Sequence, residues 1–88
     1  MRITFKLFAT LSSYLPRELD GQTRVHNQIA MDVPEGTSVQ AVVDRFALPP
    51  SLVHLVLVNG AYLPPAERPT RLLVEGDAVA VWPPIAGG

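Results

Sequence analysis

One segment of this 88-residue chain has the periodicity of an amphipathic helix. Its apolar residues fall at positions i, i+3, i+4 and i+7 and form one stripe, which consists of Val39, Val42, Val43 and Phe46. Thr37 is predicted to cap the amino end, with Gln40 completing a capping box. Pro49-Pro50 ends the helix, because proline has no amide hydrogen and disfavours helical geometry in the residue before it. A chain with one main helix must bury that stripe against a sheet.

The remaining segments carry strand and turn signals. Alternating or continuous apolar patterns predict four main strands, at residues 2–7, 28–33, 55–58 and 78–82. A short helical turn is expected at 9–15, and the polar residues 17–27 are predicted to form a loop. Asn59-Gly60 predicts a tight hairpin, because both residues tolerate a positive φ angle.

This order of elements predicts an α+β fold of the β-grasp, ubiquitin-like type, a small mixed sheet with one main helix packed on one face. A ferredoxin-like fold would need a second full helix, which the proline-rich residues 63–70 cannot form. The length suits a single domain. We divide it into a β-grasp body, residues 1–82, and an extended, flexible C-terminal tail, residues 83–88, with the sequence Pro-Pro-Ile-Ala-Gly-Gly.

Composition excludes several classes of function. The net charge is −1 and the seven basic residues are scattered, so nucleic-acid binding has little support. No apolar run approaches the roughly 18 residues that span a bilayer, so we expect no membrane segment and a cytoplasmic protein. The chain has no cysteine, and neither His26 nor His54 has a second ligand at metal-binding spacing. We therefore expect no bound metal or cofactor, and no catalysis by this chain alone.

The tail is the one segment with chemical promise. Pro83 and Pro84 each hold φ near about −65°, which makes its base stiff and extended. Gly87 and Gly88 carry no side chain, so the tip is thin. Six residues reach roughly 20 Å when extended. Such a segment suits insertion into a narrow channel of another protein, where the carboxylate of Gly88 would react.

Taken together, these segments resemble the MoaD/ThiS family of sulfur-carrier proteins. The resemblance covers nearly the whole chain and rests on five stretches: ITFKLFATL, VPEGTSVQAVVDRF, VLVNG, EGDAVAVWPP and the terminal PPIAGG. The ending is the most specific of them. It looks more like the small subunit of molybdopterin synthase than like the carrier of the thiamine pathway.

The resemblance implies a carrier and not an enzyme. An E1-like adenylyltransferase would consume ATP to adenylate Gly88, and a sulfur donor would convert the adenylate into a thiocarboxylate. The tail residues would then thread into a large, MoaE-like synthase subunit and deliver sulfur for molybdenum cofactor (molybdopterin) biosynthesis. These tail residues are Pro83, Pro84, Ile85, Ala86 and Gly87.

A docking surface beside the tail follows from strand parity. If Val79 and Val81 pack under the helix, Trp82 faces the far side of the sheet. We predict that Trp82 and Phe8 form an apolar docking patch there with one pair from strand 55–58. We assign Val56 and Val58 as that pair, and Leu55 and Leu57 are the alternative. In the competing interpretation, Trp82 folds over the edge of the core.

Three alternatives to the molybdopterin role stay open at this point. The sulfur could serve thiamine, tungsten-cofactor or another pathway, because residues 16–28 are longer and more polar than is usual in the molybdopterin members. The chain could be a ubiquitin-like modifier conjugated to targets through Gly88. It could also be a plain β-grasp interaction module in which Gly87-Gly88 has no chemical role.

Overall fold

The computed structural model of the chain describes residues 1–84. A five-stranded sheet in the order β4-β1-β7-β5-β6 organises it, and its strands are β1 Arg2–Leu7, β4 Gln28–Asp32, β5 Leu55–Val58, β6 Ala61–Tyr62 and β7 Ala78–Trp82. A separate two-stranded hairpin consists of β2 Glu18–Leu19 and β3 Gln22–Thr23. The helical elements are α1 Val39–Arg45 and the 3₁₀ turns η1 Ala9–Tyr14, η2 Pro50–Leu52 and η3 Pro65–Glu67.

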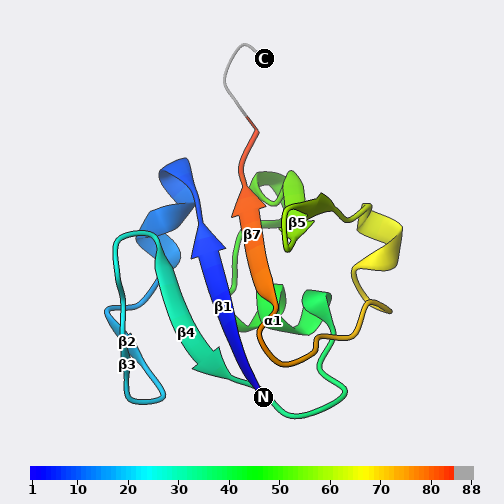
Figure 1. Cartoon of the computed structure of the whole chain (residues 1–88). Helices are drawn as coiled ribbons and strands as arrows, with labels where there is room; N and C mark the ends of the chain where they lie inside the picture. The colour runs from blue at the N-terminus through cyan, green and yellow to red at the C-terminus, as the bar shows by residue number, and fades with distance from the viewer. Residues whose placement is uncertain (85–88) are drawn as a thin grey trace.

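The two central strands, β1 and β7, run parallel, and the other pairings in the five-stranded sheet are antiparallel. The amino end of β1 and the carboxyl end of β7 therefore lie at opposite ends of the sheet (Figure 1). Residues 83 and 84 continue from the carboxyl end of β7, at the same end of the sheet as η1 and η2 (Figure 1). The predicted α+β fold, a mixed sheet with one main helix, is confirmed.

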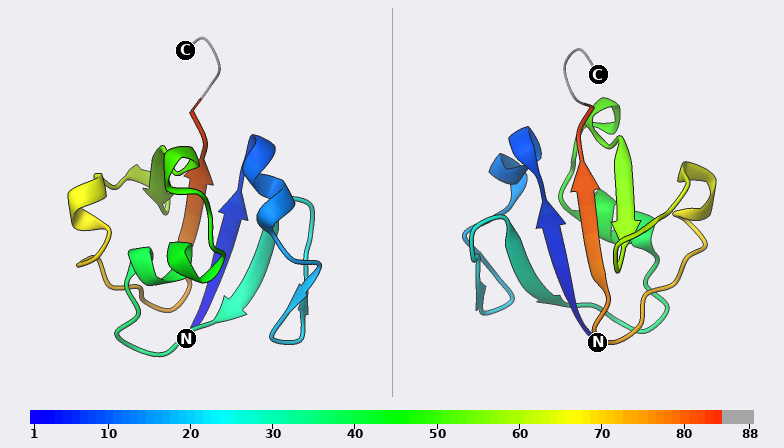
Figure 2. Two further views of the ribbon diagram at one scale, coloured as in Figure 1. Left: turned by 180° about the vertical axis from the view of Figure 1, so that it is seen from behind. Right: turned by 45° about the horizontal axis from the view of Figure 1, so that its top comes forward.

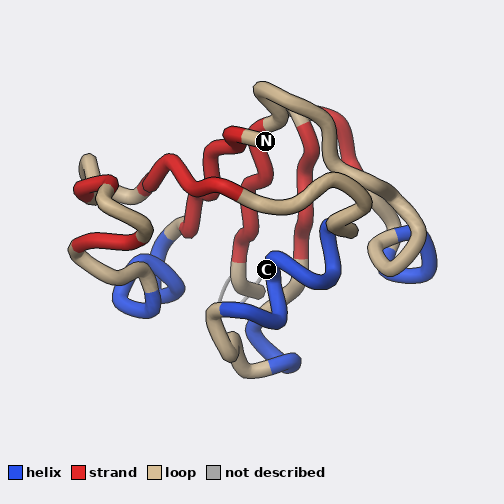
Figure 3. The backbone as a smooth tube through the Cα atoms, turned by 90° about the horizontal axis from the view of Figure 1, so that it is seen from below, coloured by secondary structure: helices blue, strands red, loops and turns tan. Residues whose placement is uncertain are grey.

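Helix α1 covers one face of the sheet (Figure 2), and the view from below also places it to one side of the strands (Figure 3). The face beneath it, which we call the closed face, carries the buried side chains of the four long strands: Ile3, Phe5, Leu7, Ile29, Met31, Val56, Val58, Val79 and Val81. The Phe5 ring stacks on Phe46 with 4.5 Å between centroids, which fixes the carboxyl end of the helix against the sheet.

Helix α1 begins one residue later than its sequence predicts. The capping side chain is Ser38, whose Oγ accepts a hydrogen bond from the Ala41 amide at 3.1 Å. The hydroxyl of Thr37 instead donates to the Pro34 carbonyl at 2.6 Å, and Gln40 donates to Asp44, so the predicted capping box does not form. Both Thr and Ser are good capping residues. The turn that begins at Pro34 occupies Thr37 and leaves the cap to its neighbour.

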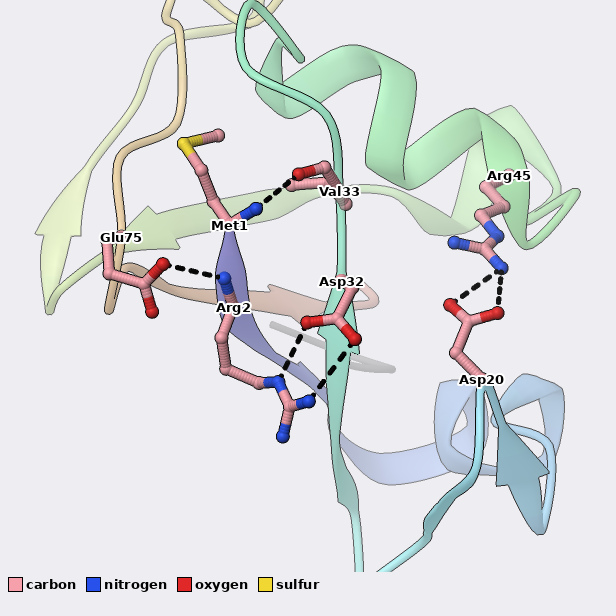
Figure 4. Close-up of polar contacts among 7 residues, drawn as sticks. All are labelled: Met1, Arg2, Asp20, Asp32, Val33, Arg45 and Glu75. Carbon is pink, nitrogen blue, oxygen red and sulfur yellow. Dashed lines mark hydrogen bonds and ion pairs between the residues drawn. The ribbon is translucent and has the colours of Figure 1, made fainter.

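The polar residues 17–27 contain the β2–β3 hairpin, where the sequence predicts only a loop. Asp20 and Gly21 form its turn with φ angles of 50° and 78°. Asp-Gly with two positive φ angles is a favoured two-residue hairpin turn. An ion pair ties the hairpin to α1, with Arg45 Nη2 3.2 Å from Asp20 Oδ2 (Figure 4).

A group of polar contacts holds the end of the sheet where β1 begins (Figure 4). The Met1 amino group donates to the Val33 carbonyl at 2.7 Å, and the Arg2 amide donates to the Glu75 carboxylate at 3.0 Å. The Arg2 guanidinium donates two hydrogen bonds to Asp32, which lower the pKa of that carboxyl. Because this pair lies in solvent, it contributes little to stability.

Candidate functional site

The base of the tail is held by backbone hydrogen bonds on both sides of β7. The Phe8 amide donates to the Val81 carbonyl at 3.1 Å, and the His54 amide donates to the Trp82 carbonyl at 3.1 Å. Pro83 is buried and Pro84 is exposed. Neither proline has an amide hydrogen with which to continue the ladder. Sheet pairing therefore ends at Trp82, which is where the sequence places the end of the body.

The predicted tail residues Ile85, Ala86, Gly87 and Gly88 lie outside the described residues. Their proposed extension and chemistry stay predictions. What the structure provides is the direction of β7, which points away from the body at Trp82 (Figure 1).

An aromatic pair lies next to the tail on the face of the sheet away from α1, which we call the open face. The rings of Phe8 and Trp82 stack with 3.7 Å between centroids and 7° between planes. Both residues are half-buried, since each covers one face of the other. The Trp82 indole N–H is buried without a hydrogen-bond partner among the described residues. The two aromatic residues predicted for docking are thus brought together, and their role in docking stays a prediction.

The structure corrects the other half of the predicted docking patch. Val56 and Val58 are 0% and 6% exposed and belong to the core under α1. They lie opposite Val81 and Val79 in the β5–β7 ladder, and residues directly opposite share a face. Leu55 pairs with Trp82 and Leu57 with Ala80, so these two leucines are the open-face pair.

The open face therefore carries a contiguous apolar surface beside the tail. We define this open-face patch by six residues: Phe8, Leu55, Leu57, Tyr62, Ala80 and Trp82. Tyr62 joins it because it pairs with Leu57 across the hairpin, and it is 56% exposed. Lys6 lies beside Ala80 in the β1–β7 register, so a cation borders the patch. An apolar centre with a charged rim is the usual composition of a protein-binding surface.

Two further motifs prove to be structural. Asn59 donates its side-chain amide to Asp77 Oδ1 at 2.9 Å and accepts from the Ala78 amide at 2.9 Å. Asp77 Oδ2 also accepts from the Val74 amide at 2.9 Å. Burial opposes ionisation of Asp77, but these hydrogen bonds and the nearby Arg71 guanidinium outweigh it and lower the pKa of the carboxyl. The Asn-Gly and Gly-Asp turns therefore lock the β5–β6 hairpin onto the start of β7.

The two histidines of the chain lie at the surface. His26 and His54 are both exposed. Within residues 1–84, no group of three metal-ligating side chains gathers. No helix in that part of the chain is both long and apolar enough to cross a membrane.

Comparison with known proteins decides the family. The model of the ThiS family matches residues 13–88. This chain belongs to the ThiS family. The members are ubiquitin-like β-grasp sulfur carriers, so the predicted family is confirmed at this level. Carriers of this kind are generally not enzymes themselves and work with E1-like activating enzymes.

A solved structure supports the fold independently. The crystal structure of SAMP1 from Haloferax volcanii superposes with a TM-score of 0.67, covers 100% of both chains and shares 21% sequence identity. At that identity the likeness establishes the fold alone. A search of curated proteins finds no significant match.

Proposed function

We propose that this ThiS-family chain is a sulfur carrier whose Gly88 carboxylate is activated and converted to a thiocarboxylate for molybdopterin biosynthesis. The observation that carries the proposal is the family match, which runs through the terminal Gly87-Gly88. The molybdopterin branch is favoured by the Pro-Pro-Ile-Ala-Gly-Gly ending, which resembles that of the synthase small subunit. We place the relay in the cytoplasm.

The chemistry assigns separate roles to the tail and to its partners. A carboxylate is a poor electrophile, so an E1-like adenylyltransferase joins a Gly88 oxygen to the α-phosphate of ATP and releases pyrophosphate. A sulfide-level sulfur donor then attacks the carbonyl carbon, the bond to the AMP oxygen breaks, and loss of the sulfur-bound proton leaves the thiocarboxylate. The softer sulfur nucleophile can attack a pterin precursor in a large, MoaE-like subunit. A chain without cysteine can thus carry sulfur on its main chain.

The geometry of the described residues supports this division of labour. The open-face patch adjoins the last paired residue of the tail, Trp82, which itself belongs to the patch. A partner that covers the patch therefore also meets the base of the tail. Pro83 and Pro84 restrict the direction in which the chain continues toward that partner's active site.

The direct test is the intact mass of the protein after incubation with ATP, its cognate activating enzyme and a sulfur donor. We expect one oxygen to be replaced by sulfur, and fragmentation should locate the change to Gly88. The mass of the protein before the reaction shows whether Gly88 carries a free carboxyl group. The matched control is a chain lacking Gly88, which keeps the whole core and should gain no sulfur. Adducts on lysines of other proteins would indicate a modifier instead, and an unchanged mass would contradict both.

The pathway needs a second assay. The thiocarboxylate form is mixed with a large synthase subunit and the sulfur-free pterin precursor, and the dithiolene product is measured. Sulfur transfer in this mixture supports the molybdopterin assignment. Transfer only in a thiamine-pathway mixture would reassign the carrier while leaving its chemistry intact.

A further inference from the structure

Arg68 is a buried cation that has one side-chain hydrogen bond and no carboxylate partner in the described part of the chain. It follows η3, is 6% exposed, and accepts the Gln40 amide on its backbone carbonyl at 3.0 Å. Its guanidinium donates one hydrogen bond, from Nη2 to the His54 carbonyl at 3.2 Å. Its Nε is buried with no partner in the described part of the chain.

No carboxylate in residues 1–84 neutralises this guanidinium. The ion pairs of the described chain join Arg2 to Asp32, Arg45 to Asp20 and Arg71 to Asp77. Arginine is a charged side chain in proteins, so the burial of this guanidinium without a carboxylate partner has a free-energy cost. Buried charges are normally paired, and a buried donor without a partner requires a physical explanation. A missing anion is such an explanation.

Arg68 lines a pocket of about 200 Å³ between α1 and the segment that contains η2. One part of its wall is apolar and consists of Val43, Leu48, Pro50 and Val53, and the polar part includes Gln40 and Asp44 from the helix. Asp44 is exposed, and its carboxylate accepts a hydrogen bond from the Gln40 side-chain amide at 2.8 Å. This carboxylate is not within ion-pair distance of the Arg68 guanidinium. The pocket thus combines a buried cation with an apolar wall.

We propose that this pocket binds a small monocarboxylate with a short apolar chain. A carboxylate accepts two hydrogen bonds from the planar guanidinium, which is the pairing that arginine favours. The apolar chain lies against Val43 and Val53. Phosphate fits less well, because it offers nothing to the apolar wall and carries more charge toward Asp44.

The pocket is separate from the open-face patch but connected to the tail. Arg68 donates to the carbonyl of His54, and the amide of His54 donates to the carbonyl of Trp82. Two hydrogen bonds therefore lie between the proposed ligand site and the last paired residue before the tail. The inference does not depend on the sulfur chemistry, because it rests on Arg68 and the pocket that this residue lines.

The test is an NMR titration of the full chain with butanoate, compared with butan-1-ol and inorganic phosphate. We expect saturable shifts of the Arg68 Nε–Hε signal and of the Val43 and Val53 methyl groups with butanoate only. Equal shifts with butan-1-ol would mean a merely apolar pocket, and equal shifts with phosphate a merely cationic one. Either result, or no saturable shift, overturns the proposal.

Two variants locate the interaction. Arg68→Gln should weaken butanoate binding about tenfold or more, since the charge-assisted hydrogen bonds are lost. Asp44→Asn removes an exposed carboxylate and needs no rearrangement of the core, so it tests the site even if the first variant fails to fold. It should bind butanoate at least as tightly as the parent. Weaker binding by Asp44→Asn would contradict the proposal, because it would make Asp44 part of the site.

Discussion

The two faces of the sheet are built from the same strands but differ in how deeply their side chains are buried. In β5, Val56 and Val58 point under α1 and are almost wholly buried, whereas Leu55 and Leu57 point to the open face and are half-buried. All four are apolar, so composition does not distinguish the faces. The difference shows that the closed face is packed into the core, while the open face leaves apolar area exposed, where we predict that a partner docks. Substitutions should therefore separate stability from function according to the face they alter.

The largest effect is expected from a charge placed on the closed face. Val56→Lys puts an ammonium group under α1 with no partner, at a cost of several kcal/mol, which is comparable with the whole stability of a small domain. The matched variant Leu57→Lys should stay folded, with a change of about 1 kcal/mol or less. Urea unfolding followed by circular dichroism measures both.

The same two variants test the predicted docking role of the open-face patch. Leu57→Lys should slow adenylation of Gly88 by the cognate activating enzyme, because the lysine interrupts the open-face patch. Unaltered adenylation by this folded variant would remove the patch from the functional site. If Leu57→Lys unfolded as readily as Val56→Lys, the distinction between the two faces would fail.

The next effect is expected at the centre of the closed face. Phe5 is 0% exposed and stacks on Phe46, so Phe5→Ala leaves a cavity beneath the end of the helix. A loss of about 3–5 kcal/mol in unfolding free energy follows for such truncations. Phe8→Ala, on the open face, should cost less, and a comparison of the two unfolding midpoints checks this. Equal losses would mean that Phe8 belongs to the core.

A smaller effect, and one that depends on pH, is expected at Asp77, where β7 begins. Asp77→Asn weakens three contacts and should cost about 1–3 kcal/mol at neutral pH. The pKa of Asp77 is lower in the folded chain than its usual value. Its ionised form therefore stabilises the fold above about pH 4, and this stability is lost as the pH falls through the lower folded pKa. Unfolding free energies measured across this acidic range should fall less steeply for Asp77→Asn than for the parent.

The smallest effect is expected at the exposed ion pair between Arg2 and Asp32. Arg2→Gln should leave the unfolding midpoint unchanged within error, because both side chains lie in solvent. A midpoint that drops in low salt and recovers in high salt would show that the pair matters more than its exposure indicates.

Sequence periodicity was sufficient to predict where the main strands and the amphipathic helix lie. The buried face of each element needs apolar residues at regular intervals, and these intervals are visible in the sequence. Periodicity failed where neighbouring residues were chemically equivalent. Leu-Val-Leu-Val has no polar member to mark its outer face, so only the pairing of Val56 with Val81 decided which residues were buried. Thr37 and Ser38 are both residues that can cap a helix, and the turn from Pro34 occupies Thr37 and leaves Ser38 to cap α1. Pairing between distant strands decides such cases.

The candidate site divides in the same way. Parity predicts the face of Trp82, because this residue ends a strand in which Val79 and Val81 point to the opposite side, and Phe8 directly follows the last residue of β1. The face of Leu57 required the β5–β7 pairing, and the place of Tyr62 required the hairpin register. Arg68 gave no signal, because a lone arginine in a proline-rich connector is usually exposed. The Asp20-Gly21 turn was available in the sequence as a hairpin signal, but the polar residues around it favoured a loop.

The parallel pairing of the two central strands has a mechanical consequence. Arg2 and Trp82 lie at opposite ends of neighbouring strands, so a pull on the tail against the amino end of β1 acts along both strands at once. Force in this direction acts on all the hydrogen bonds between β1 and β7 at the same time. Force perpendicular to the strands would break these hydrogen bonds one after another. Force applied between these two ends would therefore load all the hydrogen bonds of the β1–β7 pair in parallel.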